Sequence, residues 1–422
     1  IRLARDRQPI RRPIPFVFGR KSLKPPQMAQ DRSSQSTVLF VSLYTVMGGA
    51  EWCLYHQVKN LDRERYRALV LVNGRGALTE RLAGLPVEVL TVPFPVVMLR
   101  SLLSPSIFLR ILAASLSIRR ELRSKTIDVI QCSDVLSLIL LLPTLITRRI
   151  PVVYSVLFFY EPARTKMLKR FGRYLFRIVA DSSAVRNELL DTAPGLAQKT
   201  IVIHHAVDAN EFRPASESEK PSLRKTFSLD PTKKIVGFIG RYDVWKGHRT
   251  FLSAAEIICA QRSDVQFVMA GGALTGGVIP EVARYREEIM AKAKPFIERG
   301  DLVVLGHRGD IPDLIRTLDV LVCPSDREPF GLIILEAYAA GIPIVASETV
   351  GALELLKDAQ YIFSAALADA KSFADKILEA LANEEILANT PEREEFLRMH
   401  TWQNYTRKFE RIYGEIASIR KI

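Results

Sequence analysis

Two glutamates eight residues apart, Glu328 and Glu336, bracket a change from extended to helical sequence. An apolar run ends at Pro324, a loop follows, and Gly331 stands where helical spacing begins. The backbone N–H groups of a first helical turn lack partners within the helix, so such a turn is suited to binding a phosphate. Carboxylates accept hydrogen bonds from adjacent hydroxyls, which a sugar and a ribose both offer. The segment indicates a site for sugar, diphosphate and ribose in line, although a capped surface helix with two solvated glutamates would show the same spacing.

A second group of residues with chemical potential is basic. Arg241 and Lys246 lie in the segment GFIGRYDVWKG, directly after a run that is typical of a strand. An arginine offers a planar fork to phosphate oxygens, and a lysine offers a compact positive charge. Together they could neutralise a departing diphosphate, the role that a metal ion has in other enzymes. Two exposed bases on a loop are the alternative, but both groups follow strands in one half of the chain, which favours a shared site.

The elements that must position these residues alternate between strands and helices. Continuous apolar runs rich in β-branched residues predict buried parallel strands, and the stretches between them have helical spacing. The predicted strands are Val38–Leu43, Arg67–Val72, Ile127–Cys132, Pro151–Leu157, Arg177–Ser182, Thr200–His204, Lys234–Gly240, Val265–Ala270, Leu302–Leu305, Val320–Cys323 and Ile342–Ala346. This alternation predicts an α/β protein with two doubly wound, Rossmann-like domains that face each other across a cleft.

The domain boundaries follow from changes in composition along the 422 residues. Residues 1–36 are rich in Pro, Arg and Ser and predict a basic, flexible extension. Residues 37–214 form the first Rossmann-like domain, and the polar stretch 215–233 is predicted to be a linker. Residues 234–400 form the second domain. Residues 401–422 predict a last helix that packs back on the first domain.

Charge and cysteine content narrow the class of protein. The net charge is +13, and residues 1–36 carry nine basic residues against two acidic ones, which is more than half of that excess. Such a surplus suits a nucleotide diphosphate, an anionic lipid surface or nucleic acid. The four cysteines are scattered among apolar residues and predict reduced thiols, as in a cytoplasm. No apolar run is long enough to span a membrane, and the basic start lacks the apolar core of a signal peptide.

With these motifs in place, the chain resembles the retaining family 4 glycosyltransferases of the GT-B fold over roughly residues 37–420. The Glu-x7-Glu signature of that family is matched by Glu328 and Glu336 inside EPFGLIILEAYAAGIPIVAS. Its paired basic residues are matched by Arg241 and Lys246-Gly247. The resemblance implies a glycosyltransferase (EC 2.4) that acts on a nucleotide-sugar donor, of the UDP or GDP type, as a substrate, with no cofactor.

The resemblance also implies roles for individual residues. In the second domain they are diphosphate binding by Arg241 and Lys246, sugar contact by Glu328, backbone amides to the phosphate from Gly331 and Leu332, ribose binding by Glu336, and a cradle for the nucleobase at Gly306, His307 and Arg308. In the first domain Gly48 and Gly49 match the glycine loop that approaches the donor phosphate and the acceptor.

The chain departs from the family pattern at several positions. Leu157 stands at the strand end where relatives commonly carry a histidine assigned to sugar contact or transition-state support. Gln131-Cys132-Ser133 replaces a His-x-His type of pattern, and His205-Ala206 replaces the usual Asn-Gly before the hinge. His204 and His205 are therefore considered as substitutes, although a structural role for both is favoured.

A retaining enzyme of this kind needs leaving-group stabilisation and alignment rather than a side-chain nucleophile. No Asp-x-Asp motif is present, so no metal is expected.

The acceptor is expected to be a glycan or a lipid-linked hydroxyl, in polysaccharide, lipopolysaccharide or glycolipid synthesis. Two basic segments, Arg164–Arg177 and Leu99–Lys125, mix arginines and lysines with apolar residues and suggest an anionic membrane surface, on the inner face of the cytoplasmic membrane. Ordinary helices with solvated basic faces would look the same.

Other classes of protein are less well supported. A sugar-nucleotide epimerase shares the fold but would need its own acid and base near the sugar, and a degenerate, non-catalytic sugar-nucleotide-binding member is the second alternative. A nicotinamide dehydrogenase would carry G-x-G-x-x-G where this chain has Leu43-Tyr-Thr-Val-Met-Gly-Gly. A nucleic-acid binder is suggested by charge alone, so no nucleic-acid partner is expected.

Overall fold

The computed structural model describes residues 35–96, 104–272, 280–357, 359–383 and 390–420. The expected extension 1–36 therefore lies almost wholly outside the described residues, and the first strand begins at Ser36. Two parallel sheets follow one another along the chain and belong to one unit that runs from Gln35.

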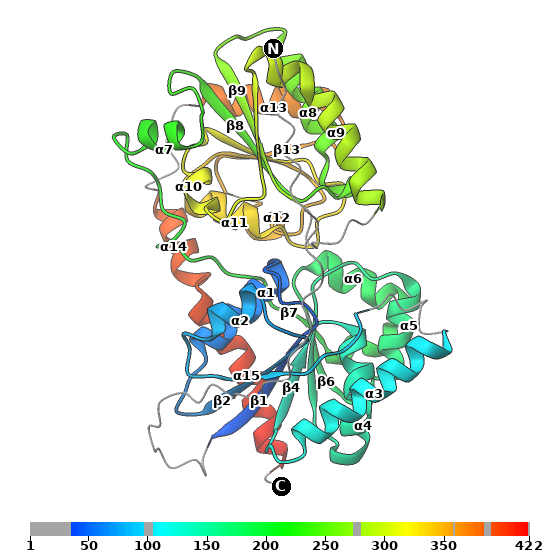
Figure 1. Ribbon diagram of the computed structural model, residues 1–422. Coiled ribbons are helices and arrows are strands. Elements are labelled where there is room, and N and C mark those ends of the chain that lie inside the picture. The colour runs from blue at the N-terminus through cyan, green and yellow to red at the C-terminus, as the bar shows by residue number, and fades with distance from the viewer. Residues whose placement is uncertain (1–34, 97–103, 273–279, 358, 384–389, 421–422) are drawn as a thin grey trace. The chain divides into compact units, whose positions relative to one another are not determined.

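The first sheet has seven parallel strands in the order β3-β2-β1-β4-β5-β6-β7 (Figure 1). The strands are β1 Ser36–Ser42, β2 Tyr66–Val72, β3 Glu88–Thr91, β4 Val129–Cys132, β5 Val152–Val156, β6 Leu175–Ala180 and β7 Thr200–Val202. The helices are α1 Gly49–Asn60, α2 Ala77–Leu82, α3 Pro105–Leu122, α4 Val135–Arg148, α5 Pro162–Arg170 and α6 Ser183–Thr192, with a 3-10 turn at Pro194–Lys199.

Strand β1 shows why this sheet is buried on both faces. Successive side chains of a strand point to opposite faces, and here both sets are apolar. Leu39 and Val41 join the core that contains α3, α4 and α6. Val38 and Phe40 join a second core on the opposite face, with α1 and the last helix of the chain. The continuous apolar run in the sequence is thus a strand between two layers of helices.

The second sheet has six parallel strands in the order β10-β9-β8-β11-β12-β13. The strands are β8 Lys234–Ile239, β9 Val265–Ala270, β10 Leu302–Gly306, β11 Val320–Cys323, β12 Ile344–Ser347 and β13 Ile362–Ala365. The helices are α7 Lys220–Thr226, α8 His248–Cys259, α9 Pro280–Arg299, α10 Ile311–Ile315, α11 Leu332–Ala339, α12 Leu353–Leu356, α13 Ala370–Ala382 and α14 Pro391–Met399, with a 3-10 turn at Val244–Lys246.

The last helix, α15 (Trp402–Arg420), packs on the first sheet rather than on the second. Its apolar residues recur every three or four positions and join the core of Val38 and Phe40. They are Trp402, Tyr405, Phe409, Ile412, Tyr413 and Ile416. Figure 1 shows α15 in red behind β1 and β2. No described strand lies near α15 in the sequence, so the helix packs on a sheet whose strands come from the first half of the chain.

The stretch 215–233 is not a free linker, because it contains α7 and packs on the second sheet. Arg224 is buried, donates to the carbonyl oxygen of Thr317 at 3.1 Å and pairs with Asp319 at 2.5 Å. Phe227 and Leu229 are buried in the same core as β11. The polar composition concealed this packing, since the contacts are made by one long basic side chain and two apolar residues at the end of the stretch.

Candidate active site

The residues singled out in the second half meet at the carboxyl ends of β8 and β11. These two strands are neighbours, with Val236 opposite Val320, and the strand order reverses between them. Ligands of doubly wound sheets bind at such a reversal point. Arg241 and Lys246 follow β8, and Glu328 and Gly331 follow β11, so the fold brings both predicted groups to one place.

Glu328 and Lys246 form an ion pair although they are far apart in the sequence. The Lys246 Nζ donates to Glu328 Oε2 at 2.5 Å, and Ser325 Oγ donates to the same oxygen at 3.1 Å. Glu328 is 6% exposed. A carboxylate that is largely removed from water needs such partners. The pair therefore fixes both side chains beside the loop that follows β11.

A close backbone crossing sets the position of these two loops. Gly247 has a φ of +80°, and a Cβ atom there would lie 1.9 Å from the carbonyl oxygen of Pro324. The Asp326 N–H donates to the carbonyl oxygen of Trp245 at 2.8 Å. Only glycine fits the first of these positions. In the Lys246-Gly247 pair, the lysine thus supplies the charge, and the glycine allows the loop to come close enough to the loop after β11 for Lys246 to reach Glu328.

Helix α11 begins at this crossing with an open end. Its N-cap is Gly331, which has a φ of +89° and no side chain that could cap the first turn. A Cβ atom at Gly331 would lie 3.0 Å from Glu328 Cγ, so the loop and the helix start are in contact. The N–H groups at Leu332 and Ile333 are available to an anion there.

Glu336 lies one turn further along α11 and is part-buried. Burial, and to a lesser extent the nearby charge of Glu211, raise its pKa to about 8. Across the described residues its carboxyl group has no hydrogen bond or ion pair. A carboxyl group in this state is costly for the folded protein unless a ligand supplies donors.

Arg241 and the expected nucleobase cradle occupy neighbouring strand ends. Arg241 pairs with Asp243 at 2.8 Å and remains about one third exposed. Gly306 ends β10 with a φ of +66° and accepts from the Gly271 N–H at 2.7 Å. His307 is exposed.

Arg308 is already engaged within the protein. Its Nε donates to Asp310 Oδ1 at 2.8 Å, and its guanidinium lies 5.2 Å from the ring centre of Phe227. Within this loop, the groups left for contact with a nucleobase are therefore the backbone and the His307 side chain.

The glycine loop of the first half, at Gly48 and Gly49, joins β1 to α1. The Gly48 N–H donates to Glu51 Oε2 at 3.2 Å, which closes the start of α1. A Cβ atom at Gly49 would lie 3.6 Å from Leu332 Cδ1. The loop therefore lies beside the open end of α11, where the predicted phosphate site is.

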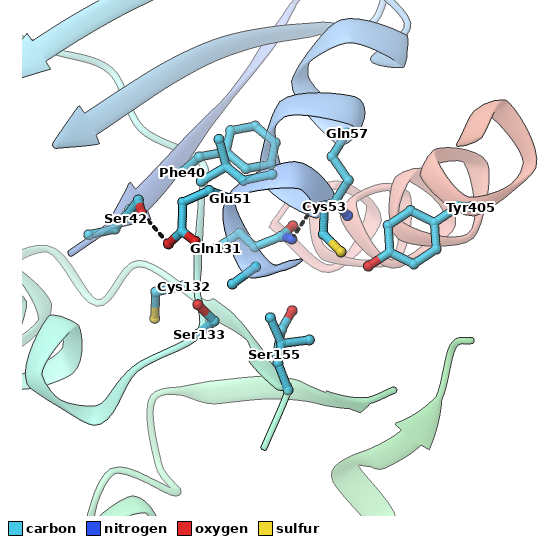
Figure 2. Close-up of a pocket in the computed structure, with 14 residues that line it drawn as sticks. Phe40, Ser42, Glu51, Cys53, Gln57, Gln131, Cys132, Ser133, Ser155 and Tyr405 are labelled. Atoms are coloured by element: carbon cyan, nitrogen blue, oxygen red, sulfur yellow. Dashed lines mark hydrogen bonds between the residues drawn. The ribbon is translucent and has the colours of Figure 1, made fainter. Parts of the chain in front are cut away.

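A small pocket of about 30 Å³ lies at the carboxyl ends of β1, β4 and β5 (Figure 2). It includes Leu157 and the Gln131–Ser133 segment, which are the positions where the sequence departs from the family pattern. The other lining residues are Phe40, Val41, Ser42, Ala50, Glu51, Cys53, Leu54, Gln57, Ser155 and Tyr405.

Glu51 is the residue of this pocket that the sequence analysis missed. It is 7% exposed, Ser42 Oγ donates to its Oε1 at 3.3 Å, and burial raises its pKa. Gln131 Nε2 donates to Gln57 Oε1 at 2.6 Å, whereas Gln57 Nε2 has no partner in the described structure. A glutamate three residues after an N-cap position is a capping signal, and this signal could have identified Glu51.

His204 and His205 make structural contacts. His204 pairs with Glu354. His205 is buried, with Nδ1 3.3 Å from Cys53 Sγ and Nε2 3.6 Å from Asp181 Oδ2. Burial lowers the pKa of His205, but Cys53 and Asp181 together raise it to about 10. Both histidines are thus held by side chains of the protein.

The segment Arg164–Arg177 is not the basic amphipathic helix that the sequence suggested. Helix α5 ends at Arg170, a turn follows, and β6 begins at Leu175. Phe171 is buried, Arg164 lies 3.7 Å from Asp134, and Arg177 pairs with Glu415 at 2.9 Å. The aromatic residues of this segment serve the core, which its composition alone did not reveal.

None of the described helices is long and apolar enough to cross a membrane. Within the described ranges, no three His, Cys, Asp or Glu side chains gather in a way that could hold a metal ion.

Two family models match the chain. The model described as "Glycosyl transferases group 1" matches residues 219–395, and "Glycosyltransferase Family 4" matches residues 47–211. The first contains the site after β8 and β11, and the second contains the glycine loop.

Curated relatives match about half of their own length. The Mycobacterium tuberculosis alpha-maltose-1-phosphate synthase is 32% identical over 185 residues, which is 43% of this chain and 46% of the relative. The Rhizobium meliloti lipopolysaccharide core biosynthesis mannosyltransferase LpsB is 36% identical over 165 residues, 39% of this chain and 45% of the relative.

Solved structures match most of the chain. Anabaena Alr3699/HepE in complex with UDP and glucose superimposes with a TM-score of 0.74 at 21% identity, over 90% of this chain and all of that one. WaaG, a glycosyltransferase involved in lipopolysaccharide biosynthesis, has a TM-score of 0.64 at 13% identity over 90% of this chain and 99% of that one. At these identities the similarity establishes the fold.

Proposed function

The chain belongs to the family 4 glycosyltransferases, which have the GT-B fold, and from this premise we propose which reaction it catalyses. We propose that it moves a sugar, with retention of anomeric configuration, from a nucleoside-diphosphate sugar of the UDP or GDP type. The acceptor is a hydroxyl group of a glycan or of a lipid-linked molecule. The nucleotide sugar is a substrate, and no cofactor or metal ion takes part.

The observation that carries the proposal is the arrangement at the reversal point of the second sheet. The Lys246–Glu328 ion pair lies against the open N-terminus of α11, and the unpartnered Glu336 lies one turn along the same helix. In this order the groups suit a sugar at Glu328, a diphosphate at Lys246 and the helix start, and a ribose at Glu336. A nucleoside-diphosphate sugar has its parts in the same order.

The leaving group is stabilised by the two bases and the helix start. In the ligand-free protein Lys246 is neutralised by Glu328, and Arg241 by Asp243. A bound diphosphate shares both cations, and the amides at Leu332 and Ile333 add neutral donors. As the bond between the anomeric carbon and the phosphate oxygen breaks, the new charge on that oxygen meets groups that are already in place.

Retention follows if the acceptor attacks from the face that the phosphate leaves. The acceptor oxygen forms the new bond to the anomeric carbon, and its proton passes to the departing phosphate oxygen, so no side-chain nucleophile is required. Gly48 and Gly49 let the backbone of the first half approach this phosphate without a side chain in between.

We further propose that the acceptor is used in polysaccharide, lipopolysaccharide or glycolipid synthesis at the inner face of the cytoplasmic membrane. The naming of one relative as a lipopolysaccharide core mannosyltransferase supports this class of acceptor. The basic excess of the chain supports an anionic surface near the acceptor.

The stereochemistry of the product tests the proposal. The protein is incubated with each candidate donor in EDTA, and the anomeric proton of the first product is read by NMR before mutarotation. The same anomer as the donor supports retention without a metal. An inverted product, or a reaction that EDTA stops, contradicts the proposed mechanism. A nucleotide sugar that is epimerised rather than consumed favours the epimerase alternative, and binding without turnover favours a non-catalytic member.

A further inference from the structure

Helix α3 has two apolar faces, of which the protein covers only one. The covered face packs toward α4 and the core of the first sheet. It consists of Ile111, Ala114, Ser115, Ile118 and Leu122. Figure 1 shows α3 in cyan beside α4. This face alone accounts for the position of the helix in the fold.

The other face exposes large apolar side chains to solvent. They are Phe108 at 57%, Leu109 at 62%, Leu112 at 42% and Leu116 at 52%. The spacing of 108, 112 and 116 is that of one helical stripe. No other described helix exposes more than one large apolar residue. A patch of roughly 300 Å² on one helix is large enough to mark a contact surface rather than scattered exposure.

The same stripe continues into basic residues toward the end of the helix. Arg119 and Arg123 follow Leu116 at helical spacing, and Arg120 lies beside them. All three are exposed, and none has an ion-pair partner among the described residues. The acidic Glu121 of this helix falls on a different side of it. The helix thus presents an apolar stripe with a cationic end.

This combination fits a bilayer better than a protein partner. An interfacial helix places its apolar side chains at the boundary of the acyl chains and its arginines at the headgroups. Anionic headgroups supply the countercharges that Arg119, Arg120 and Arg123 lack. The long arginine side chains can reach the headgroups while the apolar stripe lies deeper in the interface. The exposed bases of the Arg164–Arg177 segment offer no comparable apolar stripe, since Phe171 is buried.

We propose that α3 docks the protein on an anionic phospholipid surface. Phe108, Leu109, Leu112 and Leu116 enter the interface, and the three arginines bind headgroup phosphates. The inference deepens the proposed function, because it rests on a lipid-linked acceptor for its purpose. Vesicle binding is measured without a donor or turnover, so its failure and the failure of the transferase proposal are distinguishable.

The test uses the full chain and vesicles of phosphatidylcholine with and without 30% phosphatidylglycerol, a composition chosen on the order of a natural anionic fraction. Co-sedimentation gives the partition coefficient. We expect Leu112→Ser with Leu116→Ser to weaken binding by roughly tenfold or more. We expect Arg119→Gln, Arg120→Gln and Arg123→Gln together to remove most of the preference for the anionic lipid. Because all five side chains are exposed, circular dichroism and the melting temperature should match those of the unchanged protein.

Matched controls exchange the same kinds of residue elsewhere. Ile297→Ser with Met399→Ser removes exposed apolar side chains from other helices. Arg284→Gln, Lys292→Gln and Lys294→Gln remove three exposed bases from α9. Both controls should bind vesicles as the unchanged protein does.

A tryptophan at the stripe reports insertion directly, independently of other basic segments. In Leu112→Trp, the added fluorescence should shift to shorter wavelength on anionic vesicles and be quenched by lipids brominated in the acyl chain. Equal binding by the serine variant, or an unshifted and unquenched tryptophan, overturns the proposal. A protein that dimerises through this face, with the serine variant monomeric and vesicle binding unaltered, also overturns it in favour of a second copy.

Discussion

Replacing Glu336 with glutamine should make the ligand-free protein more stable and should weaken its binding of the nucleotide. The carboxyl group is part-buried without a protein partner, and its pKa is raised from 4.5 to about 8. Glutamine keeps the shape of the side chain but carries no charge at any pH. The substitution therefore removes the cost of the charge. It also replaces one of the two charged acceptor oxygens that we assign to the ribose by an amide NH2 group and leaves the other as a neutral acceptor.

The sign of the effect follows from the direction of the pKa shift. A group whose pKa is higher in the folded than in the unfolded state favours folding most at low pH, and this contribution is lost as pH rises from 4.5 to about 8. A shift of this size corresponds to about 5 kcal/mol at about 1.4 kcal/mol per unit. Because the side chain keeps some contact with water, we expect about 2 kcal/mol to be realised.

The assay is urea unfolding of both proteins at pH 5 and pH 8 without ligand. The advantage of Glu336→Gln should grow by about 2 kcal/mol between the two pH values. At pH 8 the variant should bind the nucleotide about tenfold to a hundredfold more weakly, the loss of a charge-assisted hydrogen bond. Glu348→Gln, at an exposed position, controls for the exchange itself. A pH-independent difference in stability would contradict the raised pKa of Glu336, and unchanged nucleotide affinity would contradict its role in ribose binding.

Three further changes test other parts of the structure. Lys246→Met leaves Glu328 buried without its cation and removes a positive charge that stabilises the leaving group, so turnover should fall by about a hundredfold or more. Lys246→Arg should restore only part of the turnover. Turnover of Lys246→Met near that of the unchanged protein would count against the role of Lys246. Gly247→Ala places a Cβ atom 1.9 Å from the Pro324 carbonyl oxygen at a φ of +80° and should lower the free energy of unfolding by about 3 kcal/mol or more, whereas Gly195→Ala, with no atom within 4 Å, should change it little. Phe409→Ala removes a fully buried ring between α15 and the first sheet and should cost about 3–5 kcal/mol in urea unfolding; a cost as small as that of the exposed Ile419→Ala would mean that α15 is not part of the core.

The sequence predicts the central strands well, because strands that are buried on both faces are continuous apolar runs. It misses β3 and β13, which lie at the sheet edges and are only partly buried. Both have only four residues, and polar residues interrupt them, so neither forms the continuous apolar run that identifies the other strands, the edge strands β7 and β10 included. It also treats 215–233 as a linker, since one buried arginine, Arg224, gives no periodic signal.

The candidate site is predictable in its members but not in their contacts. Strand ends of a parallel sheet lie at one edge, so residues after β8 and β11 must be neighbours if those strands pair. Which charges meet is decided by the crossing at Gly247, and the sequence does not show that Lys246 reaches Glu328. The raised pKa of Glu336 depends on its burial in the folded chain and on the charge of Glu211, which is distant in the sequence.

The assignment of a donor site after β8 and β11 is tested by a thermal-shift and hydrolysis screen against UDP-, GDP- and ADP-sugars in EDTA. The unchanged protein, Lys246→Met and Glu336→Gln are screened side by side. We expect one nucleotide sugar to raise the melting temperature of the unchanged protein and to be turned over. Both variants should lose most of this response although both remain folded. If no nucleotide sugar stabilises the unchanged protein, or if both variants respond as it does, the site after β8 and β11 is not where a donor binds.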